Sequence, residues 1–353
     1  MAYTTIKKPS DYFNTKLYTG TGSQLAVTGV GFQPDFVWFK NRGTTNSHGL
    51  QDVVRGFNTT GIQSSNGTDA DPAFDGSTLG YVSAVGSDGF TVEAGGCANA
   101  SGNNYVSWNW KAGTTSGITT DGNTTITPSN YSFNQASGFS ILSYTGNGVE
   151  GAKLAHGLGT TPAMVIIKRY STTGDWVVYH KNLSATKSVF LNYTDAETAR
   201  APNGYIYSPD DTNITLSNHG DVNTNGTTTI AYCFAEKKGF SKFGSYVANA
   251  SDDGPMIYLG FKPAFVLIKR TSNTNVWILL DNKRGSYNVN QSKLFPDNTD
   301  AENTDTSNGI DFLSNGFKIR RNNTEINGAS GDTFIYMAFA EEPLVGDNPA
   351  TAR

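Results

Sequence analysis

The sequence contains few of the residues on which disulfide frameworks and membrane spans depend. There are two cysteines, Cys97 and Cys233, and they lie far apart in the chain, which argues against a disulfide framework. No stretch approaches the roughly 18 apolar residues that a membrane helix requires. The first residues lack the apolar core of a signal peptide. We therefore expect a chain that is made in a cytoplasm and does not insert into a membrane.

Charge is scarce as well, and this limits the classes of function. Charged residues make up 16% of the chain and the net charge is −4, whereas a nucleic-acid binder carries a basic stripe. The chain also lacks zinc-ligand spacing, a Gly-x-Ser-x-Gly elbow, a P-loop and a dinucleotide fingerprint. We predict no enzymatic activity, no cofactor and no metal. A glycosidase stays open as an alternative, because its two carboxylates can come from distant strands.

What the chain does have is one pattern, present three times. Residues 31–40, 157–168 and 260–269 each contain a proline that is followed six positions later by a lysine, with an apolar run between them. An aromatic-rich run that ends in tyrosine precedes each proline, at residues 13–18, 139–144 and 240–246. An apolar run closes each copy, at residues 105–111, 230–236 and 334–341. A fixed internal repeat predicts similar modules, in which the shared positions belong to the scaffold.

Two further positions keep a fixed distance from the proline. Fourteen residues after it, the second and third copies have tryptophan and the first has His48. Eighteen residues after it, the first and third copies have aspartate and the second has His180. We interpret the shared residues as scaffold, and they are Pro34, Lys40, Asp52, Pro162, Lys168, Trp176, Pro263, Lys269, Trp277 and Asp281.

The local pattern is that of strands. Short runs rich in β-branched and aromatic residues are bounded by Asn, Ser, Thr and Gly, and helical periodicity is nearly absent. We predict an all-β protein of three tandem β-sandwich domains, jelly-roll-like and related by the internal repeat. The predicted parts are an N-terminal arm at 1–10, repeats at 11–112, 139–238 and 239–343, a Thr/Ser/Gly-rich linker at 113–138 and a tail at 344–353.

The shared lysines and aspartates predict cross-strand ion pairs in two of the copies. Lys40 would pair with Asp52 and Lys269 with Asp281. An exposed pair of this kind contributes about 0–1 kcal/mol to stability. Because the second copy has His180 in place of the aspartate, the pair is not essential to the fold.

Two other groups of residues have both a structural and a binding interpretation. Acidic stretches at 69–75 and 297–305 offer oxygen ligands to calcium, but solvated turns have the same composition. Core packing, which we favour, and stacking on sugars both fit four tryptophans, namely Trp108, Trp110, Trp176 and Trp277.

Several segments share features with one known family, and they are 8–20, 260–271, 277, 281–284, 311–320, 336–341 and 349–353. Together they resemble a repeat of uncharacterised function that is common in proteins of marine tailed bacteriophages, including phages of cyanobacteria. The resemblance covers almost the whole chain. It implies a virion structural protein on the particle surface, and it carries no functional residues because the family has no settled activity.

The resemblance implies a non-enzymatic virion protein, either a tail-fibre component that attaches to the host or a capsid decoration protein. A stand-alone carbohydrate-binding, lectin-like module is the alternative, and sugar affinity without incorporation into particles would distinguish it. The expected partners are other virion proteins, a host cell-surface glycan and further copies of the chain in a homotrimer, with no nucleic acid. The expected location is the virion, assembled in the host cytoplasm.

Overall fold

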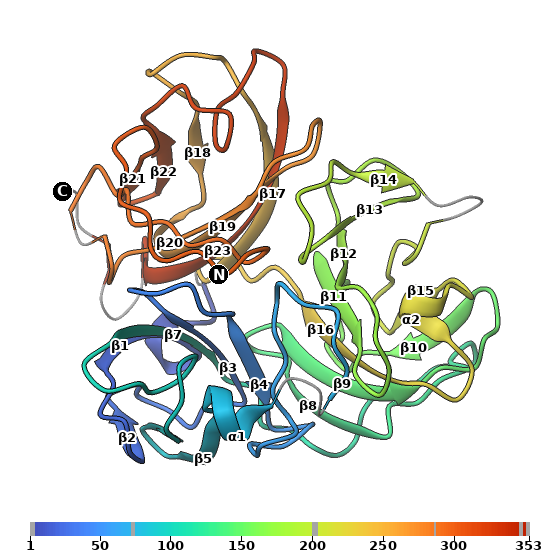
Figure 1. The fold of residues 1–353 in the computed structure, drawn as a ribbon. Coiled ribbons are helices and arrows are strands. Elements are labelled where there is room, and N and C mark those ends of the chain that lie inside the picture. Colours follow the sequence, from blue (N-terminus) through green and yellow to red (C-terminus); the bar gives the residue numbers. More distant parts are fainter. Residues whose placement is uncertain (1–3, 72–74, 200–203, 286, 346–348, 351–353) are drawn as a thin grey trace.

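The protein is all-β. The computed structural model describes residues 4–71, 75–199, 204–285, 287–345 and 349–350, which form six open sheets. The helices among them are single turns: η1 (Pro9–Asp11), α1 (Gly76–Leu79) and α2 (Gly220–Asn223). Figure 1 shows three lobes that meet in the middle of the molecule, and each lobe is one continuous stretch of the chain. We call these stretches the first segment (β1–β7), the second segment (β8–β16) and the third segment (β17–β23).

The first segment contains a four-stranded and a three-stranded sheet. The larger has the order β1-β7-β3-β4, built from β1 (Phe13–Thr19), β3 (Phe36–Asn41), β4 (Gly49–Asp52) and β7 (Asn104–Trp110). The smaller has the order β2-β6-β5, built from β2 (Leu25–Thr28), β5 (Val82–Gly86) and β6 (Gly89–Val92). All pairs are antiparallel.

The third segment has the same plan. Its larger sheet has the order β17-β23-β19-β20, built from β17 (Ser241–Val247), β19 (Phe261–Arg270), β20 (Trp277–Asp281) and β23 (Thr333–Pro343). Its smaller sheet has the order β18-β22-β21, built from β18 (Met256–Tyr258), β21 (Ile310–Leu313) and β22 (Gly316–Ile319).

The second segment keeps this plan in its larger sheet, with added strands, and departs from it in the smaller one. The larger sheet has the order β14-β13-β12-β11-β16-β9-β8. Its strands are β8 (Asn130–Asn134), β9 (Phe139–Thr145), β11 (Met164–Arg169), β12 (Val177–His180), β13 (Lys187–Phe190), β14 (Thr198–Ala199) and β16 (Thr228–Phe234). The smaller sheet contains only β10 (Ala152–Ala155) and β15 (Asn213–Leu216).

Strand register keeps the sequence equivalences. Phe36 lies opposite both Trp110 and Asp52, and Phe265 lies opposite both Phe339 and Asp281. In the second segment, Met164 takes this place, opposite Phe234 and His180. The positions that are shared in the sequence are therefore shared in space.

Both faces of each central strand are buried, which is why these strands are continuous apolar runs. In β3, Val37 and Phe39 face a cluster that includes Phe90 and Val92 of the smaller sheet. The second and third segments have clusters of the same kind between their two sheets. Because side chains alternate along a strand, the next residues point to the opposite face.

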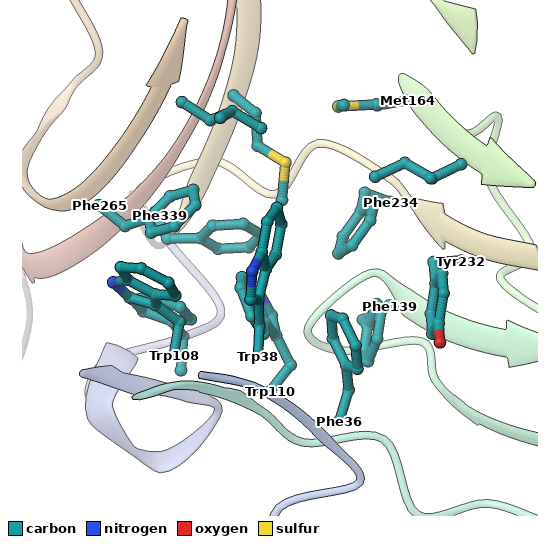
Figure 2. Packing of buried hydrophobic residues seen from close by; sticks show 14 of the residues in the cluster. Phe36, Trp38, Trp108, Trp110, Phe139, Met164, Tyr232, Phe234, Phe265 and Phe339 are labelled. Carbon is teal, nitrogen blue, oxygen red and sulfur yellow. The ribbon is translucent and has the colours of Figure 1, made fainter. Parts of the chain in front are cut away.

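That opposite face lies on a cluster in the middle of the molecule, to which all three segments contribute (Figure 2). Trp110 lies at the centre of this cluster, because the centre of its ring is 4.9–6.5 Å from the centres of aromatic rings in every segment. These rings are Phe13, Phe36, Phe139, Phe234, Phe265 and Phe339. The large sheets therefore share one core in addition to the core that each has with its smaller sheet.

The structure differs from the expected boundaries at two places. The stretch 113–138, which we expected to be a linker, contains β8, and β8 pairs with β9 along five residues. In the N-terminal arm, Ile6 is buried in the central cluster. The reason is the same at both places, since polar composition concealed a few apolar residues that contact distant strands. Residues 1–3 lie outside the described part.

Candidate functional site

The residues eighteen positions after each shared proline form hydrogen bonds between segments. We call the three interfaces between segments seams. Asp52 of the first segment accepts a hydrogen bond from the Tyr232 hydroxyl of the second at 2.7 Å. Asp281 of the third accepts one from the Trp108 indole of the first at 3.0 Å. His180 of the second donates from Nε2 to the carbonyl of Tyr336 in the third at 3.1 Å. Equivalent residues thus join first to second, second to third and third to first.

A second set of equivalent residues crosses the same seams in the other direction. The Trp176 indole donates to the carbonyl of Ser64 in the first segment at 2.8 Å. The Trp277 indole donates to the carbonyl of Phe190 in the second segment, also at 2.8 Å. Ser64 and Phe190 are equivalent. Ser64 follows Gln63, which lies opposite Leu50 of β4, and Phe190 follows Val189, which lies opposite Val178 of β12. The seam between the first and second segments and the seam between the second and third are therefore held from both sides.

His48 takes the tryptophan position at the seam between the third and first segments. Its Nδ1 accepts a hydrogen bond from the Trp38 indole at 2.9 Å. Burial lowers the pKa of His48 well below its usual value, against a smaller opposite effect of the Phe295 main chain in the third segment. Nε2 itself forms no well-aligned hydrogen bond. His48 is therefore neutral, and it fills a seam position mainly by packing.

The aspartates are paired with arginines rather than with lysines. Arg55 Nε lies 2.7 Å from Asp52, and Arg284 Nε lies 2.6 Å from Asp281, with all four side chains buried. The other oxygen of each aspartate accepts from main-chain N–H groups of the following turn. In the sequence, an Arg-Gly pair begins three residues after each of these aspartates, but this local pattern does not show that the ion pair lies at a seam.

The predicted lysine–aspartate pairs are wrong, and strand register explains why. Asp52 lies opposite Phe36, so Lys40 is four residues farther along β3. The same offset separates Asp281 from Lys269. The two charges therefore lie at opposite ends of the strand pair.

The shared lysines instead donate to main-chain carbonyls. Lys168 reaches the carbonyls of Thr68 and Asp69 in the first segment at 3.0 and 2.9 Å. Lys269 reaches Thr194 in the second segment at 2.9 Å. Lys40 donates to Asn41 and Thr44 within its own segment at 2.7 and 3.2 Å. All three are buried, and burial lowers the pKa of each to about 8.

The low pKa of Lys269 predicts a pH dependence of stability. Between about 8 in the folded chain and the ordinary 10.5, the unfolded chain binds the additional proton, so raising the pH favours folding. Over this range the wild type should gain up to about 3 kcal/mol relative to Lys269→Met, since one pKa unit corresponds to about 1.36 kcal/mol. Urea denaturation of both proteins in steps of pH measures the difference, and Lys168→Met is a second test at an equivalent site. Parallel pH curves for wild type and variants would contradict the prediction.

The shared prolines precede or interrupt the central strands. Pro34 and Pro162 are buried just before β3 and β11. Pro263 lies inside β19, where the register with β23 shifts on both sides of it. A proline has no N–H to donate, so it is tolerated in a sheet at such an irregularity.

One family model matches residues 8–343, which is almost the whole chain. The chain belongs to the DUF7483 family. This family is described as a domain of unknown function, and the match extends over all three segments. No curated protein and no solved structure is significantly similar to the chain.

The acidic loops of the DUF7483 chain neutralise arginines. Asp71 contacts Arg55, and Glu302 binds both Arg42 at 2.7 Å and Arg284 at 3.0 Å. Across the residues that the structure describes, no three or more His, Cys, Asp or Glu side chains gather as a metal site would require. Residues 72–74 of the first loop lie outside this part.

Aromatic side chains of the DUF7483 chain are core residues where we weighed sugar stacking. Trp108, Trp110, Trp176 and Trp277 are at most 1% exposed. None of these four can therefore stack on a ligand from solvent, and core packing, which we favoured, is confirmed. In the described residues, each helix is a single turn, far shorter than a bilayer-crossing helix.

Proposed function

We propose that the chain is a non-enzymatic structural protein of a tailed bacteriophage, exposed on the virion as a tail-fibre component or a capsid decoration protein. In this proposal its fold is three tandem β-sandwich domains, jelly-roll-like and related by the internal repeat. Its partners are other virion proteins, a host cell-surface glycan and, in a fibre, further copies of the chain. The sequence resemblance to virion proteins of marine phages supports the first point.

The observation that carries the proposal is the set of equivalent seams. Asp52, His180 and Asp281 each contact the next segment in a closed cycle, and a single aromatic cluster lies at the middle. One chain thus presents three similar lobes around a centre. Such a body approximates a trimer and suits a three-fold position on a capsid or in a fibre.

The use of charge supports the same interpretation. At the seam between the first and second segments, Asp52 and Arg55 are buried, and both form hydrogen bonds with the Tyr232 hydroxyl. At the seam between the third and first segments, Asp281 and Arg284 are buried, Asp281 accepts from the Trp108 indole, and Arg284 lies over the Trp108 ring. Buried Asp–Arg pairs whose hydrogen bonds are all made within the protein rigidify these two seams, and they are poorly suited to transferring protons.

Immunogold electron microscopy of purified particles tests this proposal. We expect an antibody raised against the chain to label virions of the phage that encodes it. Label on tails or fibres would assign the chain to host attachment, and label on heads would assign it to decoration. Particles from a phage with the gene deleted provide the control for antibody specificity. Absence of label from intact virions, with the chain detected only in the soluble lysate, would refute the proposal.

A further inference from the structure

The second segment has an irregular stretch where the other two segments have a regular strand. In the first segment, β5 begins with Val82 opposite Val92, and in the third, β21 begins with Ile310 opposite Ile319. The equivalent residue of the second segment is Ile206, which forms a single bridge to Leu216. The residues that follow stay beside β15 without regular ladder pairing, since the Tyr207 N–H donates to the Thr215 carbonyl and the Asp210 N–H to the Asn213 carbonyl, both at 2.9 Å. The third strand of this smaller sheet is therefore reduced to an irregular stretch with a single bridge.

Beside this stretch, β12 is less completely covered than its equivalents in the other two segments. Tyr179 of this strand is only half-buried. Its equivalents, Gln51 and Leu280, are 0% and 3% exposed. In the first segment the Gln51 side chain bonds to both main-chain groups of Val82, so β5 itself closes the space.

A cavity of about 390 Å³ lies at this place. Its wall comprises Tyr179, residues 180, 181 and 183–187 from the end of β12 to the start of β13, and Ile206, Tyr207 and Ser208 from the irregular stretch. This volume lies within the usual range for small-ligand sites, about 300–1,000 Å³. A functional site in a repeated structure is expected where the repeat is broken, and this cavity lies at such a place.

The two lysines of the lining are neutralised by carboxylates that lie just outside it. Lys181 is paired with Glu236 at 2.6 Å, and Lys187 is paired with Glu197 at 3.0 Å. The Ser184 hydroxyl donates to the same Glu197 at 2.6 Å. The charges at the rim are thus compensated within the protein. The Ser208 side chain is hydrogen-bonded to the Tyr179 hydroxyl, so the oxygens of Ser184 and Ser208 can meet a ligand as acceptors.

We propose that this cavity binds one unit of a neutral saccharide. The ring of Tyr179 provides an apolar platform for the C–H face of the sugar, and Ser184 and Ser208 contribute hydroxyls for its polar edge. An anionic ligand is disfavoured because both lysines already have carboxylate partners. This inference concerns binding alone, and it holds whether or not the chain is part of a particle.

Saturation-transfer NMR on the full chain tests the proposal, with glucose, galactose, mannose and N-acetylglucosamine as probes. We expect transfer to at least one of them, and a dissociation constant at least about tenfold weaker in Tyr179→Ala. Ser208→Trp fills the cavity from an exposed position, so it should abolish binding in a chain that folds normally. Tyr258→Ala removes an exposed tyrosine of the third segment and should leave binding unchanged.

Three results would overturn the inference. They are no transfer to any of the four sugars, equal binding by the wild type and Ser208→Trp, and binding of glucuronic acid in preference to glucose. The first two refute the site, and the third refutes a neutral ligand. None of them bears on whether antibody labels virions, so the two proposals fail separately.

Discussion

Replacing Trp110 by alanine should lower the free energy of unfolding by about 3–5 kcal/mol, the range for a large aromatic removed from a packed core. Trp110 is 1% exposed and contacts rings of all three segments. Its loss leaves a cavity where the three large sheets meet, and no single segment can close it. Urea denaturation followed by circular dichroism measures the change.

Two variants control this experiment. Trp110→Phe should cost clearly less, because the equivalent residues Phe234 and Phe339 are phenylalanines and the Trp110 indole N–H has no hydrogen-bond partner. Tyr287→Ala removes an aromatic side chain that is 84% exposed and should leave stability within about 0.5 kcal/mol of the wild type. If Trp110→Ala were as stable as Tyr287→Ala, the central cluster would not hold the segments together.

The second large effect is expected at the seam between the third and first segments. Asp281→Ala should destabilise the chain by about 3–5 kcal/mol, because it leaves the buried Arg284 without its closest counter-charge. It also removes the acceptor of the Trp108 indole. The same denaturation experiment measures this loss.

The second segment provides the matched control for this variant. There His180 and Leu183 stand where the third segment has Asp281 and Arg284. The double variant Asp281→His, Arg284→Leu leaves no unpaired charge and should lose less stability than Asp281→Ala alone. A double variant that is less stable than Asp281→Ala would show that the aspartate acts through something other than its pairing with Arg284.

Much of the fold follows from local pattern. The apolar runs at 105–111, 230–236 and 334–341 predicted central strands, and these are β7, β16 and β23. The repeated proline and lysine located equivalent positions, because a period that is kept in sequence is also kept in strand register. These features depend on neighbours within a few residues, which a sequence displays directly.

The partners of the shared residues could not be predicted in this way. Asp52 meets Tyr232, which is 180 residues away, and nothing near either residue indicates the other. The lysine–aspartate error arose because equal spacing from the proline was taken to mean proximity, although the hairpin register separates the two residues. The cavity beside Tyr179 was also missed, since it lies beside a stretch that is irregular where the other two segments have a strand.

The seam between the third and first segments has a consequence for synthesis. Arg42 and Glu302, which join across it, are 260 residues apart. While the ribosome is still translating the third segment, the aromatic face around Trp110 has only two of its three walls. A nascent or truncated chain that ends near residue 238 would therefore present Phe13, Trp110 and Phe234 to water, because each of these rings packs on rings of the third segment. Such a surface favours aggregation. We therefore expect the yield of folded chain to depend on how fast the third segment is translated and packs on the aromatic face around Trp110.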